Sequence, residues 1–447
     1  MKESISANFE VGINRGVSGV LEPNSKKFKC WSPKNFHIKS HSDIYGKTHI
    51  GQPISLLNCL SHKQTQHLGG EGSNCTCDLF SHTMILGDEY VFPEKDLFDS
   101  ISLVVGNPLK LFKDIKSFGY IQFPKEGLIK ALNEEEHTPF FEIEKHPNIA
   151  YFNGDFEIFS QLTKLGKVTA SHAYSSGIWG TAEGVHIKNN IIITIDFSSS
   201  KKLDDAFKKA NLLTLFFRFI AGQGLYFKKI KLKKSGDEDF NYEVRHDYRN
   251  WGEGNSEEYF YSDPLINVVS DKFGEILKNW FDKEDRENVR NCFYSSYFSD
   301  VYSSDRLIGS ANMFDIFPQH QESLKKKFDP EAKAQIDSLK LQIKLDFKSF
   351  PEIKSSLLQS VSLLERKSLK DKIIERISIL KPELVGHILS FVDFDLIVKY
   401  GVKCRNYFVH GSIDKYLSPE ECFHFQSFFI DVFEYICSKR ISRVWLE

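Results

Sequence analysis

The chain has 447 residues, of which 41% are hydrophobic and 14% aromatic, so it can bury sizeable cores and is long enough for two or three domains. Its formal net charge of −2 excludes a protein whose whole surface attracts nucleic acid, so any RNA contact has to be local. Its eight cysteines lack the spacing of a disulfide framework, which favours reduced thiols and a cytoplasmic location.

Two segments bear on membranes and secretion. The N-terminus, Met-Lys-Glu-Ser, is polar and lacks the apolar stretch of a secretory signal. The most apolar long segment, 212–227, contains Arg218 and a Gly-Gln-Gly at 222–224, which a bilayer-spanning helix disfavours. We therefore expect no membrane partner.

The first half of the chain predicts β-strands. Short apolar runs separated by glycine, proline, asparagine and aspartate recur from residue 9 to about residue 195. Examples are 17–21, 54–57, 102–105 and 191–195. This spacing is typical of a mostly antiparallel domain of the sandwich type. A helix is predicted next, over residues 200–221.

Two pairs of zinc-type ligands lie in this half, on either side of a glycine-containing loop. Cys59 and His62 form one pair, and Cys75 and Cys77 form the other. Four such ligands can hold zinc in a tetrahedron, so the pattern predicts a structural zinc site without a role in chemistry. The Cys-X-Cys spacing departs from the usual ligand spacings. The alternative is a set of buried cysteines beside a surface histidine loop.

Segment 227–234, Phe-Lys-Lys-Ile-Lys-Leu-Lys-Lys, predicts a lysine-rich strand. One interpretation is a basic strip that contacts a nucleic-acid backbone. The other, which is the commoner role for such a strand, is a solvated edge strand whose lysines prevent aggregation.

The composition changes after residue 235. Residues 236–262 are polar, which predicts a linker, and the pattern is helical from residue 263 onward. Helices are expected at 330–345, 357–380 (broken by Ser368), 383–408 (in two pieces around Gly401) and 419–440. The predicted fold is therefore α+β and multidomain: a sandwich-like β domain over 1–235, a linker over 236–262, and an all-α bundle over 263–447 with its core at about 300–447.

Segment 404–411, Cys-Arg-Asn-Tyr-Phe-Val-His-Gly, combines side chains suited to phosphate chemistry. Arg405 can hold a phosphate with its planar fork, and His410 can move a proton near neutral pH. Asn406 and His410 share a helix face, whereas Arg405 lies to its side. Gly411 predicts a helix end that exposes the imidazole. The same pattern also fits a structural histidine near a helix end.

The arginine, the adjoining asparagine and the later histidine, placed late in a helical region after the acidic and apolar segment 393–397, resemble the motif of HEPN domains. In that family the arginine is followed by four to six residues and then the histidine. Segment 306–315 takes the place of an earlier helix in the ApeA-like branch, with Asp315 where a glutamate is common. No role is assigned to Asp315.

The first half carries a resemblance of its own. Residues 19–21, the Gly-Lys-Thr at 46–48, the following Gly51 and the leucine-rich segment 54–59 are similar to the N-terminal domain of ApeA-type anti-phage proteins. The resemblance implies that this domain senses infection or restrains the nuclease.

The resemblance implies an endoribonuclease of anti-phage defence (abortive infection). The 2′-OH of RNA would attack the adjacent phosphate without a metal or other cofactor, leaving a cyclic phosphate and a 5′-OH. His410 would be the general acid or base, Arg405 would neutralise the phosphate charge, and Asn406 would orient His410 or a phosphate oxygen. The partners implied are an RNA substrate, with tRNA as one candidate, a phage-derived trigger of unknown identity, and a second copy that forms a homodimer through the HEPN domain.

Two alternatives stay open. One is a HEPN module that binds RNA or nucleotides without cutting. The other is a ligand-binding β domain with a helical dimerisation tail.

Overall fold

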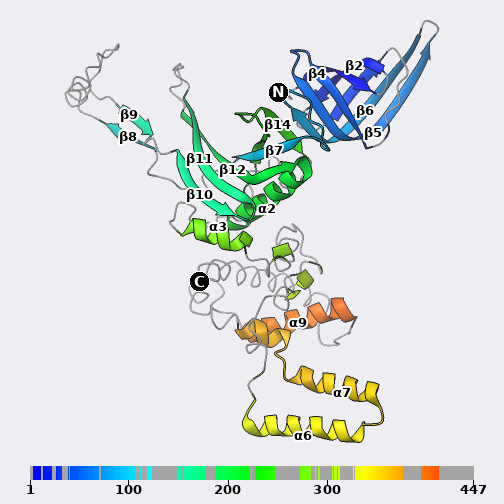
Figure 1. Cartoon of the computed structure of the whole chain (residues 1–447), viewed down its shortest axis with the longest axis vertical. Helices are drawn as coiled ribbons and strands as arrows, with labels where there is room; N and C mark the ends of the chain where they lie inside the picture. The colour runs from blue at the N-terminus through cyan, green and yellow to red at the C-terminus, as the bar shows by residue number, and fades with distance from the viewer. Residues whose placement is uncertain are drawn as a thin grey trace. The chain divides into compact units, whose positions relative to one another are not determined.

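In a computed structural model, the chain divides into two compact units, residues 1–282 and 283–447 (Figure 1). The structure describes residues 4–11, 14–22, 27–32, 39, 41–69, 72–106, 111–112, 118–122, 148–152, 156–176, 187–221, 225, 227–246, 272–282, 287, 290–291, 305, 307–309, 311–312, 326, 328–375 and 394–411. None of the helices in these ranges is long and apolar enough to cross a bilayer.

The first strands of the chain form a closed antiparallel sheet. They are β1 (Ile5–Val11), β2 (Asn14–Glu22), β3 (Lys27–Ser32), β4 (Ser42–Thr48), β5 (Pro53–Gly69) and β6 (Gly72–Leu86). Their order is β3-β2-β1-β4-β5, and β6 closes the ring because it pairs with both β5 and β3. Alternate side chains fill the interior, among them Phe9, Phe28 and Leu79. The predicted sandwich is therefore wrong here: one sheet closes on itself instead of facing a second.

A second, open sheet continues from the closed one. It contains β7 (Leu97–Val105), β10 (Glu157–Thr163), β11 (Gly166–Ser176), β12 (Ile187–Lys202), β13 (Phe227–Lys234) and β14 (Tyr242–His246), in the order β10-β11-β12-β7-β13-β14. The junction is β6, whose residues 83–86 pair with β14 while its residues 75–80 pair with β3. Strands β8 (Phe118–Gln122) and β9 (Asn148–Phe152) form a separate pair.

Two helices pack within the same unit. Helix α2 (Leu203–Ala221) starts directly after β12 and buries an apolar stripe, which includes Ala206, Phe207, Ala210, Leu213, Phe216, Phe217 and Ile220. Helix α3 (Phe273–Asp282) packs against β10 and brings Phe273 and Trp280 to ring-centroid distances of 6.2 and 5.4 Å from Phe216.

These contacts place the boundary between the two units after Asp282, whereas the sequence pattern places it in a linker at 236–262. Strand β14 lies inside the predicted linker, yet it pairs with β6 and β13. Helix α3 lies inside the predicted bundle, yet it packs on the sheet, so the first unit extends to Asp282.

The elements that the structure describes in the second unit are helices, as predicted. Helix α6 (Pro330–Asp346) matches the prediction of 330–345. It begins at Pro330 because Asp329 caps it, accepting a hydrogen bond of 2.7 Å from the backbone N of Ala332. Helix α7 (Pro351–Leu364) begins earlier than predicted, but the predicted break near Ser368 is confirmed, because residues 365–368 are not helical and the helical pattern resumes over 369–375. Helix α9 (Phe394–His410) runs unbroken through Gly401, which is buried, so the predicted break is wrong. The helix predicted at 419–440 lies outside the described residues.

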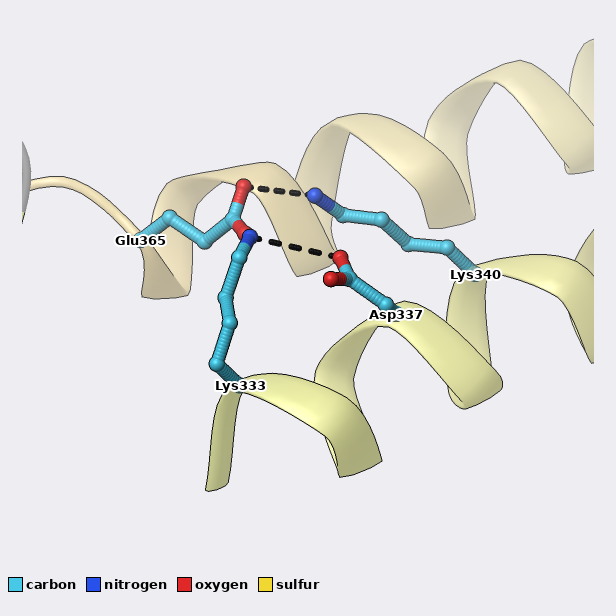
Figure 2. A network of polar contacts seen from close by, with 4 residues as sticks. All are labelled: Lys333, Asp337, Lys340 and Glu365. Carbon is cyan, nitrogen blue, oxygen red and sulfur yellow. Dashed lines mark hydrogen bonds and ion pairs between the residues drawn. The ribbon is translucent and has the colours of Figure 1, made fainter. Parts of the chain in front are cut away.

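An ion-pair network joins α6 to the end of α7 (Figure 2). Glu365 accepts hydrogen bonds from Lys333 and, at 2.5 Å, from Lys340, and Lys333 also lies 3.3 Å from Asp337. The network fixes the carboxylate against two turns of α6.

Candidate functional site

Arg405 lies in the last part of α9 and is half-buried. Its Nη1 donates a hydrogen bond of 3.0 Å to Oδ1 of the adjacent Asn406. Its Nη2 donates a shorter one, 2.7 Å, to Oδ1 of Asn312, which is 93 residues earlier in the chain. The Nε is buried without a hydrogen-bond partner. Two amides therefore fix the plane of the guanidinium, and one of its donors stays unsatisfied.

Asn312 is a functional candidate that the sequence pattern missed. Its neighbours Leu307 and Ala311 are buried, which anchors the segment that presents it. No spacing rule connects an asparagine with an arginine so far along the chain. Asp315, by contrast, lies outside the described residues.

His410 is the final residue of α9 and its side chain is exposed. Gly411 follows with φ +66°, and its backbone N donates a hydrogen bond of 2.8 Å to the carbonyl O of Tyr407. A residue in the left-handed region at this position ends a helix, and glycine adopts it without strain. The predicted helix end and the exposed imidazole are confirmed.

The three residues directly before His410 are apolar and exposed. Tyr407, Phe408 and Val409 are 43%, 41% and 41% exposed, and the two rings lie 5.3 Å apart. Consecutive residues of a helix lie about 100° apart around its axis, so these three side chains do not share one face.

The helix sets how these side chains diverge. Arg405 and His410 are five residues apart, so they lie about 140° apart around the axis and about 7.5 Å apart along it. Asn406 and His410 are four residues apart and lie about 40° from each other. One copy of α9 thus carries a cationic fork and a proton carrier on different sides.

The four predicted zinc ligands all lie in β5 and β6, but they do not converge. Cys59 is paired with Ser81, whereas Cys77 is paired with Gln64 and Cys75 with Gln66. The three thiols are buried in the interior of the closed sheet, whereas His62 is exposed at the register shift between Ser61 and Lys63. Within the described ranges, no group of three His, Cys, Asp or Glu residues could hold a metal ion.

A further cysteine, Cys30, lies directly opposite Cys77 on β3. Its thiol donates to the carbonyl O of Cys77 at 3.3 Å, and the Ser61 hydroxyl lies 3.4 Å from the Cys77 sulfur. The hydrogen bond from Cys30, and then that from Ser61, lower the pKa of Cys77 to about 7 against the effect of burial. Contact with Cys77 and burial raise the pKa of Cys30. The thiols here serve as hydrogen-bonded core residues.

The lysine-rich strand β13 is not an edge strand, because it pairs with β7 on one side and β14 on the other. Two of its lysines face acids: Lys229 lies 3.4 Å from Glu243, and Lys234 lies 3.1 Å from Glu89 and 3.2 Å from Asp96. The edge interpretation is wrong. The ion pairs reduce the positive charge that this strip offers to a nucleic acid.

Comparison with known families identifies the family to which the chain belongs. The family model described as ApeA N-terminal domain 1 matches residues 13–280, which is more than half of the chain and nearly all of the first unit. The chain belongs to the ApeA family. ApeA-like proteins are a family of anti-phage defence. No curated protein and no solved structure matches the chain.

Proposed function

We propose that this ApeA-like chain is a cytoplasmic endoribonuclease that cleaves RNA during anti-phage defence, with tRNA as one candidate substrate. The observation that carries the proposal is that the last turns of α9 carry both a fixed, half-buried guanidinium, on Arg405, and an exposed imidazole, on His410.

The reaction needs a proton carrier and a cation, and no metal. The 2′-oxygen forms a bond to phosphorus while the bond from phosphorus to the 5′-oxygen breaks. The proton of the 2′-OH is removed, and the leaving 5′-oxygen gains one. His410 performs one of these two transfers as general base or general acid. The products are a 2′,3′-cyclic phosphate and a 5′-OH.

Arg405 stabilises the charge that builds on the non-bridging phosphate oxygens. Asn406 contacts Arg405 in the structure, so we assign both Asn406 and Asn312 to positioning the guanidinium.

The active form is a homodimer built through a HEPN bundle. Because Arg405 and His410 diverge on one helix, a second α9 is needed to present a cation and a proton carrier to the same phosphate. Burying any of the exposed side chains of Tyr407, Phe408 and Val409 against the second copy would add to the stability of the dimer.

The test is cleavage of total RNA by the purified chain in the presence of EDTA, with the ends of the products mapped. The His410→Ala variant should lose about 10²–10⁴-fold in rate, the usual contribution of a general acid or base. A matched control is His49→Ala, since His49 is an exposed histidine of the first unit. Cleavage that survives His410→Ala, or ends other than a cyclic phosphate and a 5′-OH, would overturn the proposal.

A further inference from the structure

The outer face of the closed sheet contains a pocket of about 730 Å³. It is lined by residues of three neighbouring strands: Lys27, Phe28 and Lys29 of β3, Leu60, Ser61 and His62 of β5, and Asp78, Leu79 and Phe80 of β6. This volume lies in the range of small-ligand sites, roughly 300–1,000 Å³. We propose that the pocket binds a nucleoside phosphate, either as a free nucleotide or as part of single-stranded RNA.

The strand alternation decides which side chains the pocket offers. Lys27 and Lys29 are exposed, whereas Phe28 between them is buried in the interior. The register places Lys27 opposite Phe80, and Phe80 opposite Leu60 of β5. It places Lys29 opposite Asp78. The outer face therefore carries a cationic row on β3 beside a mixed apolar and acidic row.

The two lysines are available to a ligand. Neither Lys27 nor Lys29 forms an ion pair or a side-chain hydrogen bond with another described residue, in contrast to Lys229 and Lys234 of β13. Because Lys27 and Lys29 are two residues apart on one strand, their Cα atoms are about 6.6 Å apart. Both ammonium groups can therefore reach the same phosphate or neighbouring phosphates. His62, exposed at the rim, adds a third group able to contact an anion.

The remaining lining fits a base and its sugar. The Phe80 ring and the exposed Leu60 side chain offer an apolar surface on which a planar base can stack. The Asp78 carboxylate accepts hydrogen bonds from base N–H groups or ribose hydroxyls, which a simple inorganic anion lacks. The same carboxylate repels an acidic peptide. The two lysines, the Phe80 ring and the Asp78 carboxylate together therefore favour a nucleotide as the ligand.

This inference does not depend on RNA cleavage. All residues that line the pocket belong to the first unit, whereas Arg405 and His410 belong to the second. Binding is therefore measured on the full-length chain carrying His410→Ala, which removes cleavage from the readout. One arm titrates AMP, GMP, CMP and UMP by calorimetry. The other arm measures the fluorescence anisotropy of labelled single-stranded oligoribonucleotides.

Replacing both lysines with glutamine should weaken binding about tenfold or more and reduce the slope of log K against log[salt] by about 1.4, because two phosphate contacts on a single strand are lost. Phe80→Leu keeps an apolar side chain but removes the stacking ring, and should also weaken binding about tenfold. The matched control is Lys47→Gln, since Lys47 is an exposed lysine on β4 of the same closed sheet. The control should bind like the parent.

The two arms distinguish the source of the ligand: binding of mononucleotides alone indicates a free nucleotide, and binding of the oligonucleotides indicates an RNA strand. Far-UV circular dichroism and thermal unfolding confirm that each variant is folded. The proposal is overturned if the parent binds neither probe. It is equally overturned if the lysine and Phe80 variants bind like Lys47→Gln.

Discussion

The sheet unit and the α6–α7 pair use apolar residues in opposite ways. In the sheet unit Phe216, Phe217 and Trp280 are at most 1% exposed, and their rings pack within one cluster. In the helix pair Leu345 is 74% exposed, and the buried residues are Ile343 of α6 and Val361 of α7. Packing holds the first region together, whereas the second adds a side-chain cap on α6 and partly exposed ion pairs to a sparse apolar contact.

The largest effect should come from breaking the aromatic cluster of the sheet unit. Trp280→Ala removes a side chain that is 1% exposed, so we expect a loss of about 3–5 kcal/mol in the free energy of unfolding. Leu345→Ala, in the exposed helix, should cost less than about 0.5 kcal/mol. Urea unfolding followed by circular dichroism measures both. Equal costs for the two substitutions would remove the contrast between the regions.

The next effect concerns a contact that joins distant segments of the second unit. Asn312→Ala removes the 2.7 Å hydrogen bond to Arg405, so the guanidinium loses one of its two anchors. If the chain cleaves RNA as proposed, kcat should fall about tenfold with little change in KM, because the loss concerns orientation in the transition state.

Asn312→Asp provides the control, because it keeps an oxygen acceptor at the same place and should restore most of the rate. If Asn312→Asp is as slow as Asn312→Ala while both variants unfold at the same urea concentration, Asn312 does not position the arginine.

The smallest effect should come from the ion pairs of α6 and α7. Hydrogen bonds from Lys333 and then Lys340 lower the pKa of Glu365 to about 2. Because the pKa in the folded state lies below the ordinary value of about 4.3, the stabilisation is present above that value and is lost as the pH falls towards 2. Since the pairs are partly exposed, the contribution is modest.

Glu365→Gln should therefore lower Tm slightly at pH 7 and leave it unchanged relative to the parent near pH 2, as measured by circular dichroism. Glu352→Gln, in the exposed first turn of α7, is the matched control. A difference between Glu365→Gln and the parent that persists undiminished at pH 2 would contradict the assigned cause.

Local features of the fold could be predicted from the sequence, because they depend on neighbouring residues. The lysine-rich strand 227–234 and the start of α6 behind Asp329 follow from alternation and capping. The helix end at Gly411 follows from the conformational freedom of glycine.

Strand partners could not be predicted, because alternation fixes which face a side chain takes but not which strand lies beside it. The pairing of β6 with three strands and the contact between Asn312 and Arg405 both join distant parts of the chain. The zinc pattern shows the same limit, since four candidate ligands close in sequence are separated by strand register and by the position of His62.

The two lysine-bearing strands, β3 and β13, show how a neighbouring strand changes the positive charge that a strand can offer to a ligand. Each carries lysines on an exposed face, but the Glu243 that neutralises Lys229 lies on the adjoining strand β14. The charge available to a ligand is therefore a property of strand order and not of composition.

Strand β6 has a consequence for how the first unit can be divided. One edge of β6 pairs with β5 along its length, whereas the other edge pairs with β3 over residues 75–80 and with β14 over residues 83–86, so the backbone of one strand is shared by both sheets. A fragment that stopped before β14 would leave residues 83–86 with an open strand edge, which invites aggregation. Expression of the ApeA-like domain alone should therefore extend to Asp282, and amide protons on both sides of the junction should exchange as a single cooperative block.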